Sequence, residues 1–254
     1  MKKQTLLWGL ALMMCVAFTH AATNSTCNCV AFRLSNVQDY YMTKQQLAIM
    51  NVFRTYQIPL TIGVAADYFG VDTQTVGTIK IATAAPTWPT EIACNGFSYT
   101  DMSALTQQQQ VQQLTRCSAK LNAIFGKKPT TFVPPMGAFN AETLAAMQVT
   151  GFTHLSAFAS TDNGPYPLKN TSLDQTGVWR FPAGAATNNM TNTAYYSPLS
   201  ADATWASVQA QIAANGFAVV DIHPYEFAPY NKDYGFYDES TVNTDQVQQL
   251  TRLI

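Results

Sequence analysis

Short apolar runs alternate along the chain with longer segments in which apolar residues recur every three or four positions. The short runs predict strands, which fall at residues 29–34, 58–64, 91–97, 131–133, 152–159, 178–181 and 217–222. The longer segments predict amphipathic helices at residues 43–56, 106–125, 141–149, 202–215 and 244–254. Residues 79–82 fit either element, and residues 164–177, rich in Pro, Asn and Gly, predict a loop. Strands that alternate with helices predict an α/β domain with a mainly parallel sheet, open or closed into a barrel.

The amino-terminal segment has the three-part layout of a secretory signal peptide. A positively charged start precedes an uncharged apolar run at residues 6–18, and residues 19–21 place small side chains around a cleavage site. A membrane-spanning helix needs about 20 apolar residues, so this run is too short, and no later segment qualifies. We therefore expect a secreted, extracellular protein with a signal peptide at residues 1–21 and a single domain at residues 22–254.

The composition narrows the classes of partner. The chain of 254 residues carries a net charge of −1, and only 11% of its residues are charged. A nucleic-acid-binding protein would carry a basic patch or stripe, and this sequence has none. The composition predicts an uncharged polar surface, which suits neutral ligands such as sugars. Three Asn-x-Ser/Thr sequons are candidate glycosylation sites in a eukaryotic host, and they begin at Asn24, Asn170 and Asn189.

Four cysteines remain after signal-peptide cleavage, namely Cys27, Cys29, Cys94 and Cys117. An even number in an oxidising compartment favours disulfides, and four cysteines allow three pairings. Cys27 and Cys29 are so close in sequence that we expect each to pair with Cys94 or Cys117 instead. A Cys-x-Cys metal site is the alternative, but zinc sites usually separate their cysteines by two to four residues.

Polar residues gather where the predicted strands end, which is where α/β folds place their working groups. Four such segments are LSNVQDY at residues 34–40, ACNGFSYTD at 93–101, FVPPMG at 132–137 and VDIHP at 220–224. As an ordered series, these segments resemble the NodB-homology polysaccharide deacetylases, most strongly over residues 32–70. The resemblance implies a distorted (β/α) barrel and metal-assisted removal of an acetyl group from an N-acetylated sugar.

The family's catalytic groups fall on substituted positions in this chain. In the family, an Asp-Asp pair supplies a general base and a metal ligand, a His-x-x-x-His pair supplies two more ligands, and a later histidine is the general acid. By this resemblance, the base position is Ser35, and the three ligand positions are Asn36, Asn95 and Tyr99. The general-acid position is His223, whose other interpretation is a histidine that caps the end of a strand.

These substitutions predict that the metal site is lost. A serine needs its own activating partner, an asparagine offers a neutral oxygen, and a tyrosine keeps its proton near neutral pH. Catalytic zinc needs three strong nitrogen, sulfur or anionic oxygen ligands. We expect no cofactor; the alternative is one divalent metal such as zinc in a relocated site that uses Asp39, Cys94 or Asp101. His154 lies in an apolar run and is interpreted as a hydrogen-bonded core residue.

Other matching residues are expected to wall a cleft. Pro134 and Pro135 match a wall loop of the family, although a rigid turn explains them equally well, and Phe181 lies in a second wall segment. The aromatic residues that could stack on a sugar are Trp88, Tyr99, Trp179, Phe181 and Tyr225.

Three functions remain open on this evidence. The first is a catalytically inactive, deacetylase-like protein that binds an N-acetylated or neutral polysaccharide in the remnant cleft. The second is an active metal-dependent carbohydrate N-deacetylase with a non-standard site, and the third is a structural cell-surface protein. The predicted helix at residues 244–254 either closes the fold or belongs to a C-terminally incomplete chain.

Overall fold

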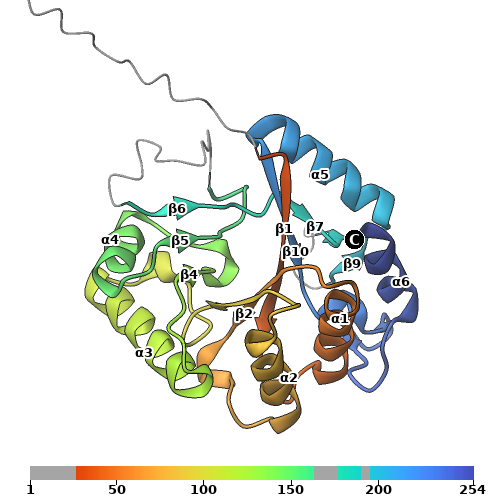
Figure 1. Cartoon of the computed structure of the whole chain (residues 1–254), viewed down its shortest axis with the longest axis horizontal. Coiled ribbons are helices and arrows are strands. Elements are labelled where there is room, and N and C mark those ends of the chain that lie inside the picture. The colour runs from red at the N-terminus through yellow and green to blue at the C-terminus, as the bar shows by residue number, and fades with distance from the viewer. Residues whose placement is uncertain (1–26, 163–176, 190–194) are drawn as a thin grey trace, which may run out of the picture.

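The computed structural model describes residues 27–162, 177–189 and 195–254 (Figure 1). The predicted signal peptide, the sequons at Asn24 and Asn170, and nearly all of the predicted loop at 164–177 lie outside these residues. No helix in the described ranges is long and apolar enough to cross a membrane.

Within the described residues, a sheet of eight strands forms the centre of the molecule (Figure 1). Its order is β6-β5-β4-β3-β2-β1-β10-β7, and every neighbouring pair is parallel. The strands are β1 (Cys29–Val37), β2 (Leu60–Val64), β3 (Thr90–Cys94), β4 (Thr131–Phe132), β5 (His154–Leu155), β6 (Trp179–Arg180), β7 (Ala185–Ala186) and β10 (Phe217–Ile222).

One short segment links the two edges of this sheet. Residues 179–186 pair with β5 through β6 and with β10 through β7, and Ala183 bridges to Phe158 between them. The sheet therefore curls into a half-barrel, and the predicted distorted (β/α) barrel of the polysaccharide deacetylase type is confirmed.

Six α-helices from the described part of the chain surround the sheet (Figure 1). They are α1 (Thr43–Tyr56), α2 (Thr73–Ala84), α3 (Gln107–Phe125), α4 (Ala141–Thr150), α5 (Ala201–Asn215) and α6 (Thr244–Leu253). The predicted helix boundaries agree closely because capping groups mark them. The Thr106 side chain accepts from the Gln109 N–H in a capping box, and α3 ends at Gly126 in the left-handed region with φ of 70°.

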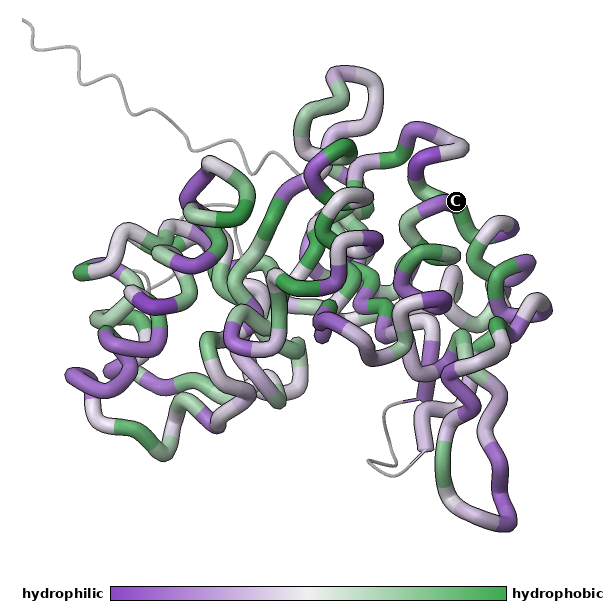
Figure 2. Tube along the Cα trace, turned by 90° about the horizontal axis from the view of Figure 1, so that it is seen from below, coloured by the Kyte–Doolittle hydropathy of each residue, from purple (hydrophilic) through white to green (hydrophobic). Residues whose placement is uncertain are grey.

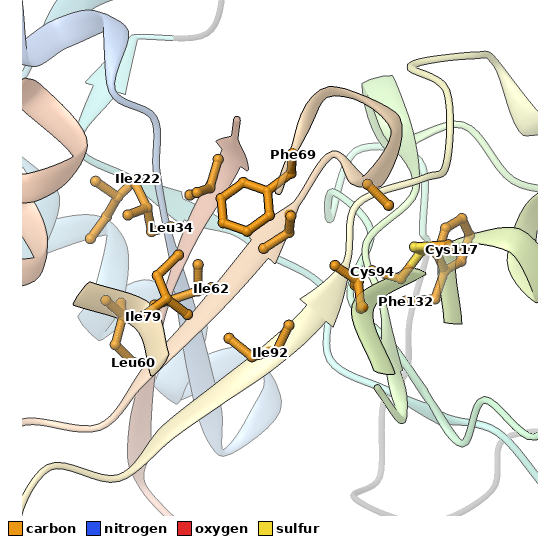
Figure 3. Close-up of a cluster of buried hydrophobic side chains, with 14 of the residues drawn as sticks. Leu34, Leu60, Ile62, Phe69, Ile79, Ile92, Cys94, Cys117, Phe132 and Ile222 are labelled. Carbon is orange, nitrogen blue, oxygen red and sulfur yellow. A yellow bond between two sulfur atoms is a disulfide. The ribbon is translucent and has the colours of Figure 1, made fainter. Parts of the chain in front are cut away.

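The core lies between the sheet and these helices. Leu34, Ile62, Ile92 and Ile222 project from neighbouring strands into one apolar cluster (Figure 3). Figure 2 shows that hydrophilic and hydrophobic residues alternate along the helices. Helix α6, the last element described, packs against α1 and α5 and buries Leu250.

Two predicted elements differ from those observed. The expected strand at 152–159 pairs regularly only at β5, because its later residues bend around the single bridge of Phe158. The ambiguous residues 79–82 lie in α2, where Asp72 caps the first N–H groups and Thr75, Ile79 and Ala82 share the buried face. Helical spacing and a cap therefore outweigh the strand propensity of the β-branched residues.

Two small antiparallel hairpins were not predicted. One joins β8 (Asn188–Asn189) to β9 (Ser197–Pro198), and the other joins β11 (Tyr230–Asn231) to β12 (Phe236–Tyr237). Both follow strands of the sheet and lie in the second half of the chain.

The expected cysteine pairing is wrong. The disulfides join Cys27 to Cys29 and Cys94 to Cys117. Asn28 takes a left-handed φ of 47°, which turns the backbone and brings the Cα atoms of Cys27 and Cys29 to 5.1 Å, within the range that a disulfide spans. Cys94 at the end of β3 faces Cys117 of α3 at a Cα separation of 6.2 Å (Figure 3).

Candidate functional site

The carboxyl ends of the parallel strands meet at one end of the half-barrel, and most of the predicted site residues lie there. Ser35 and Asn36 belong to the last part of β1, Asn95 and Tyr99 follow β3, and His223 follows β10. β1 lies directly between β2 and β10, so its end lies at the centre of this group.

The three positions aligned with metal ligands are tied to one another by hydrogen bonds. The Asn36 backbone N–H donates to Asn95 Oδ1 at 2.8 Å, and Asn95 Nδ2 donates to the Val133 carbonyl at 3.0 Å. The Tyr99 hydroxyl bonds with the Asn36 side chain and with the backbone of Met136. We call Asn36, Asn95 and Tyr99 the neutral triad.

The neutral triad does not fit a catalytic divalent metal. Asn95 Oδ1 is already an acceptor, and burial raises the pKa of the Tyr99 phenol, so the phenol keeps its proton. An amide oxygen and a protonated phenol are weak ligands compared with imidazole or carboxylate. Throughout the described residues, no group of three or more His, Cys, Asp and Glu side chains is arranged to hold a metal ion.

The residues proposed for a relocated metal site have other partners. Asp39 accepts from the Val71 N–H, and Asp101 accepts from both the N–H and the hydroxyl of Ser103. Cys94 is in a disulfide. These three residues therefore make separate local contacts, and no reaction step through a metal is derived for them.

A buried ion pair lies beside the base position, and the sequence analysis missed it. Arg33 Nε is 3.0 Å from Asp221 Oδ1 and 3.0 Å from Ser35 Oγ, and the Ser35 hydroxyl donates to Asp221 Oδ1 at 2.6 Å. Arg33 Nη1 also donates to Ser156 Oγ at 2.8 Å and to the Ser156 carbonyl. Ser35 is thus held in a buried polar network, in which its hydroxyl donates to the Asp221 carboxylate.

Burial keeps the general-acid position neutral, against the opposing effect of the Asp221 charge. Burial acts to raise the pKa of Asp221, but the Arg33 guanidinium, His223 and hydrogen bonds hold it below its usual value. Burial lowers the pKa of His223, whose Nδ1 lies 3.6 Å from Asp221 Oδ2. His223 is therefore a neutral imidazole at physiological pH, whereas a general acid must hold a proton that it can give up.

A second buried acid supports the loop that carries His223. Glu226 Oε1 accepts from the His223 N–H at 3.1 Å and from the Thr187 hydroxyl at 2.5 Å. Burial raises the pKa of Glu226 to about 7. This carboxyl therefore joins the end of β10 to the segment between β7 and β8.

A cavity of about 550 Å³ opens beside His223 and the neutral triad. Tyr99, Met136 and Tyr196 form part of its wall, and Ala159, Ala183, Ala185 and Ala186 supply small apolar surface. None of the described residues that line it is Asp, Glu, Lys or Arg. A hollow of similar volume, about 560 Å³, lies at the opposite end of β1, β2 and β3, away from these polar groups.

Of the remaining predicted residues, some lie beside the neutral triad and one lies at the opposite end of the sheet. Pro135 packs so closely on Gly96 that a Cβ at Gly96 would come within 2.7 Å of the proline ring, which places the Pro134–Pro135 turn against the neutral triad. Phe181 is not among the cavity-lining residues, and its ring packs against His154 and Phe217. Phe181 therefore lies near the start of β10, at the opposite end of this strand from His223.

The aromatic residues that were predicted to stack on a sugar differ in their burial and in their distance from the cavity. Trp88 is buried and donates its indole N–H to the Ile58 carbonyl at 3.0 Å, which is a core role. Trp179 lies on β6 and is 36% exposed. Tyr225 stacks on Tyr196, which lines the cavity.

Comparison with known proteins agrees with this architecture. The family model described as polysaccharide deacetylase matches residues 38–155, and no curated protein sequence matches the chain. Over residues 38–155 the chain therefore matches the polysaccharide deacetylase family, and these findings are consistent with a NodB-homology member of it.

Solved structures share the fold at low sequence identity. A putative polysaccharide deacetylase from Mycobacterium smegmatis is 15% identical with a TM-score of 0.62, and the alignment covers 88% of this chain and 82% of that one. A family 4 carbohydrate esterase from Streptomyces lividans, in complex with acetate, is 14% identical with a TM-score of 0.53 and coverages of 88% and 86%.

One structural relative is itself described as a pseudoenzyme. This CE4 family protein from Bacillus anthracis is 15% identical with a TM-score of 0.50, and the alignment covers 78% of this chain. The aligned region spans 55% of the length of that protein. At these identities, the likeness shows the fold alone.

Proposed function

We propose that this protein is a secreted, non-hydrolytic, metal-independent member of its family that binds a neutral, N-acetylated polysaccharide in the cavity beside His223. The observation that carries the proposal is the neutral triad, whose hydrogen-bonded amide and phenol groups stand where the family has its metal ligands. Without a metal, nothing in the family mechanism polarises the acetyl carbonyl or lowers the pKa of the attacking water.

The lining of the cavity supports a neutral sugar as the ligand. Its described residues carry no ionised carboxylate or ammonium group, so a charged sugar would lose its hydration without gaining a counter-charge. Alanines and Met136 give apolar surface on which an acetyl methyl group can be buried, while Tyr99, Tyr196 and His223 offer hydrogen-bonding groups and ring faces.

Secretion rests on the signal-peptide pattern at residues 1–21. The two disulfides support an oxidising compartment, since such bonds persist outside the cytosol. A non-hydrolytic role also has a parallel in the family, because a relative from Bacillus anthracis is described as a CE4 pseudoenzyme.

Binding and hydrolysis can be measured on the same purified protein. We expect calorimetry to show binding of N-acetylglucosamine oligomers and weaker binding of the corresponding deacetylated, cationic oligomers. We expect acetate release to stay at the buffer rate, with or without added zinc. Ser160→Trp, at an exposed part of the cavity wall, should abolish binding, whereas Thr83→Trp, which lines the hollow at the opposite end, should not.

Each contrary result has a definite meaning. Acetate release that a chelator abolishes would overturn the proposal in favour of an active deacetylase with a non-standard metal site. Absence of binding to every acetylated oligomer would overturn it in favour of a structural protein.

A further inference from the structure

Six tyrosines form a continuous set of ring contacts next to the cavity. Tyr196, which lines the cavity, stacks on Tyr225 with ring centroids 4.8 Å apart and planes inclined by 17°. Tyr225 also contacts Tyr41 and Tyr237, each at 5.8 Å. The contacts continue from Tyr237 to Tyr230 at 4.9 Å, and from there to Tyr195 at 4.5 Å. We call these six residues, Tyr41, Tyr195, Tyr196, Tyr225, Tyr230 and Tyr237, the tyrosine array.

The tyrosine array is assembled from segments that are distant in sequence. Tyr41 follows β1, Tyr195 and Tyr196 precede β9, and Tyr225 follows β10. The last two come from the β11–β12 hairpin, whose turn carries the exposed ring of Tyr234 and whose second strand begins with the exposed Phe236. All six rings are half-buried, so each is packed on one side and keeps some contact with solvent.

The hydroxyl groups give this surface polar edges. The Tyr196 backbone N–H donates to the Tyr237 hydroxyl at 2.6 Å, and the Tyr41 and Tyr225 hydroxyls bond to each other. Burial raises the pKa of Tyr196 and of Tyr237 to about 12, so both phenols remain neutral over the physiological range. Apolar ring faces edged by neutral hydroxyls match a sugar, which has an apolar C–H face and a rim of hydroxyls.

We propose that the tyrosine array is a second carbohydrate-binding subsite that continues from the cavity through Tyr196. The preferred ligand is then a neutral oligosaccharide several sugars long, with one sugar in the cavity and the following sugars on the rings. This inference rests on the proposed function, because the cavity sets where the sugar chain begins. Continuity through Tyr196 and the neutral hydroxyl edges of the rings favour a sugar chain over a charged peptide.

The dependence of affinity on ligand length tests the inference. The probes are β-1,4-linked N-acetylglucosamine oligomers from one to six sugars, titrated into the purified full-length secreted chain by calorimetry. We expect the affinity of the wild-type protein to rise at least tenfold from the disaccharide to the hexamer. This measurement needs no variant, and equal affinities for the two ligands would overturn the inference.

Variants at Tyr230 separate a binding role from a packing role. Tyr230 lies in the tyrosine array but not on the cavity wall, so Tyr230→Ala should remove most of the gain with length while disaccharide affinity is kept. Tyr230→Phe keeps the ring and should bind nearly as wild type. Tyr56→Ala, an exposed tyrosine of α1, is the matched control and should change nothing.

The failures can be told apart. Disaccharide binding without any length dependence rejects the tyrosine array as a subsite but leaves the proposed function intact. Equal losses for Tyr230→Ala at every length assign the residue to packing and also reject the subsite. No binding at any length rejects both proposals.

Discussion

Glu226 links the pH of the solution to the stability of the fold. Burial raises the pKa of this carboxyl from 4.5 to about 7 in the folded protein. Between these values the folded state holds a proton that the unfolded state has released, so stability falls as pH rises. A difference of this size corresponds to a loss on the order of 3 kcal/mol between about pH 4.5 and about pH 7. Urea unfolding at a series of pH values measures it.

The matched variant for this prediction is Glu226→Gln. It keeps a side chain that can accept from the His223 N–H and the Thr187 hydroxyl but cannot ionise. Its stability should stay flat over the pH range in which the wild-type protein loses stability. A wild-type slope that survives in this variant would assign the effect to another group.

The Arg33–Asp221 pair should be costly to break from one side. Both side chains are almost fully buried, with exposed fractions of 2% and 1%. Asp221→Asn leaves the guanidinium without its counter-charge, which typically costs about 3–5 kcal/mol. The double variant Arg33→Met/Asp221→Leu should lose much less, because no buried charge remains. Equilibrium unfolding in urea of the wild-type protein and the two variants compares these losses.

An exposed ion pair in the same protein is the control. Arg252 and Asp202 lie 3.3 Å apart, and their side chains are 59% and 83% exposed. Asp202→Asn should change stability by less than about 1 kcal/mol, because solvent screens such pairs. An equal loss of stability at the buried and the exposed ion pair would show that burial does not determine the cost of breaking such a pair.

At the residue scale, the sequence predicted which residues stand at the family's ligand positions, but it did not predict the ion pair between two strands. Asn36, Asn95 and Tyr99 were singled out because the family resemblance places metal ligands at their positions, and the structure brings them together. Arg33 and Asp221 were missed because their partnership depends on the register of β1 beside β10, where they are paired neighbours. A basic and an acidic residue inside two otherwise apolar strands were the available signal.

The two disulfides should contribute unequally to stability. Cys94–Cys117 joins β3 to α3 across a sequence separation of 23 residues, while Cys27–Cys29 spans a separation of 2. Loop-closure entropy then predicts a loss of about 3 kcal/mol for Cys94→Ala/Cys117→Ala and about 1–2 kcal/mol for Cys27→Ala/Cys29→Ala. Thermal and urea unfolding of the two double variants compare them. An equal loss would show that chain entropy does not set the difference.

At the element scale, long periodic segments were predicted well and short pairings were not. α1 lies at the predicted residues 43–56, and β10 at 217–222, because each repeats its apolar pattern over several turns or residues. The pairs β8–β9 and β11–β12 contain only two residues per strand, too few for any period to be visible. These hairpins carry or adjoin most of the tyrosine array, so the sequence reading identified only Tyr225 of that surface.

At the scale of the whole molecule, an apolar core between the sheet and the helices holds the half-barrel together. Its apolar core is continuous from β1 to α6, and the positions aligned with metal ligands are satisfied by hydrogen bonds among themselves. Fold and site therefore vary independently in this protein, as they do in other widely used folds. The family resemblance predicted the framework, whereas the chemistry depends on a few substituted side chains.

Thermal unfolding tests whether the stability of the fold depends on a bound metal. A ligand that binds only the folded state, at a concentration of about 100 times its Kd, adds about 2.7 kcal/mol of stability. For a chain of this size, that amounts to a rise in Tm of about 5–10 °C, which we expect with N-acetylglucosamine hexamer. Zinc or a chelator should leave the Tm unchanged, because the neutral triad offers no strong ligand to a cation. A Tm that falls on chelation would mean that a bound metal stabilises the folded state, and the assignment of the neutral triad would have to be abandoned.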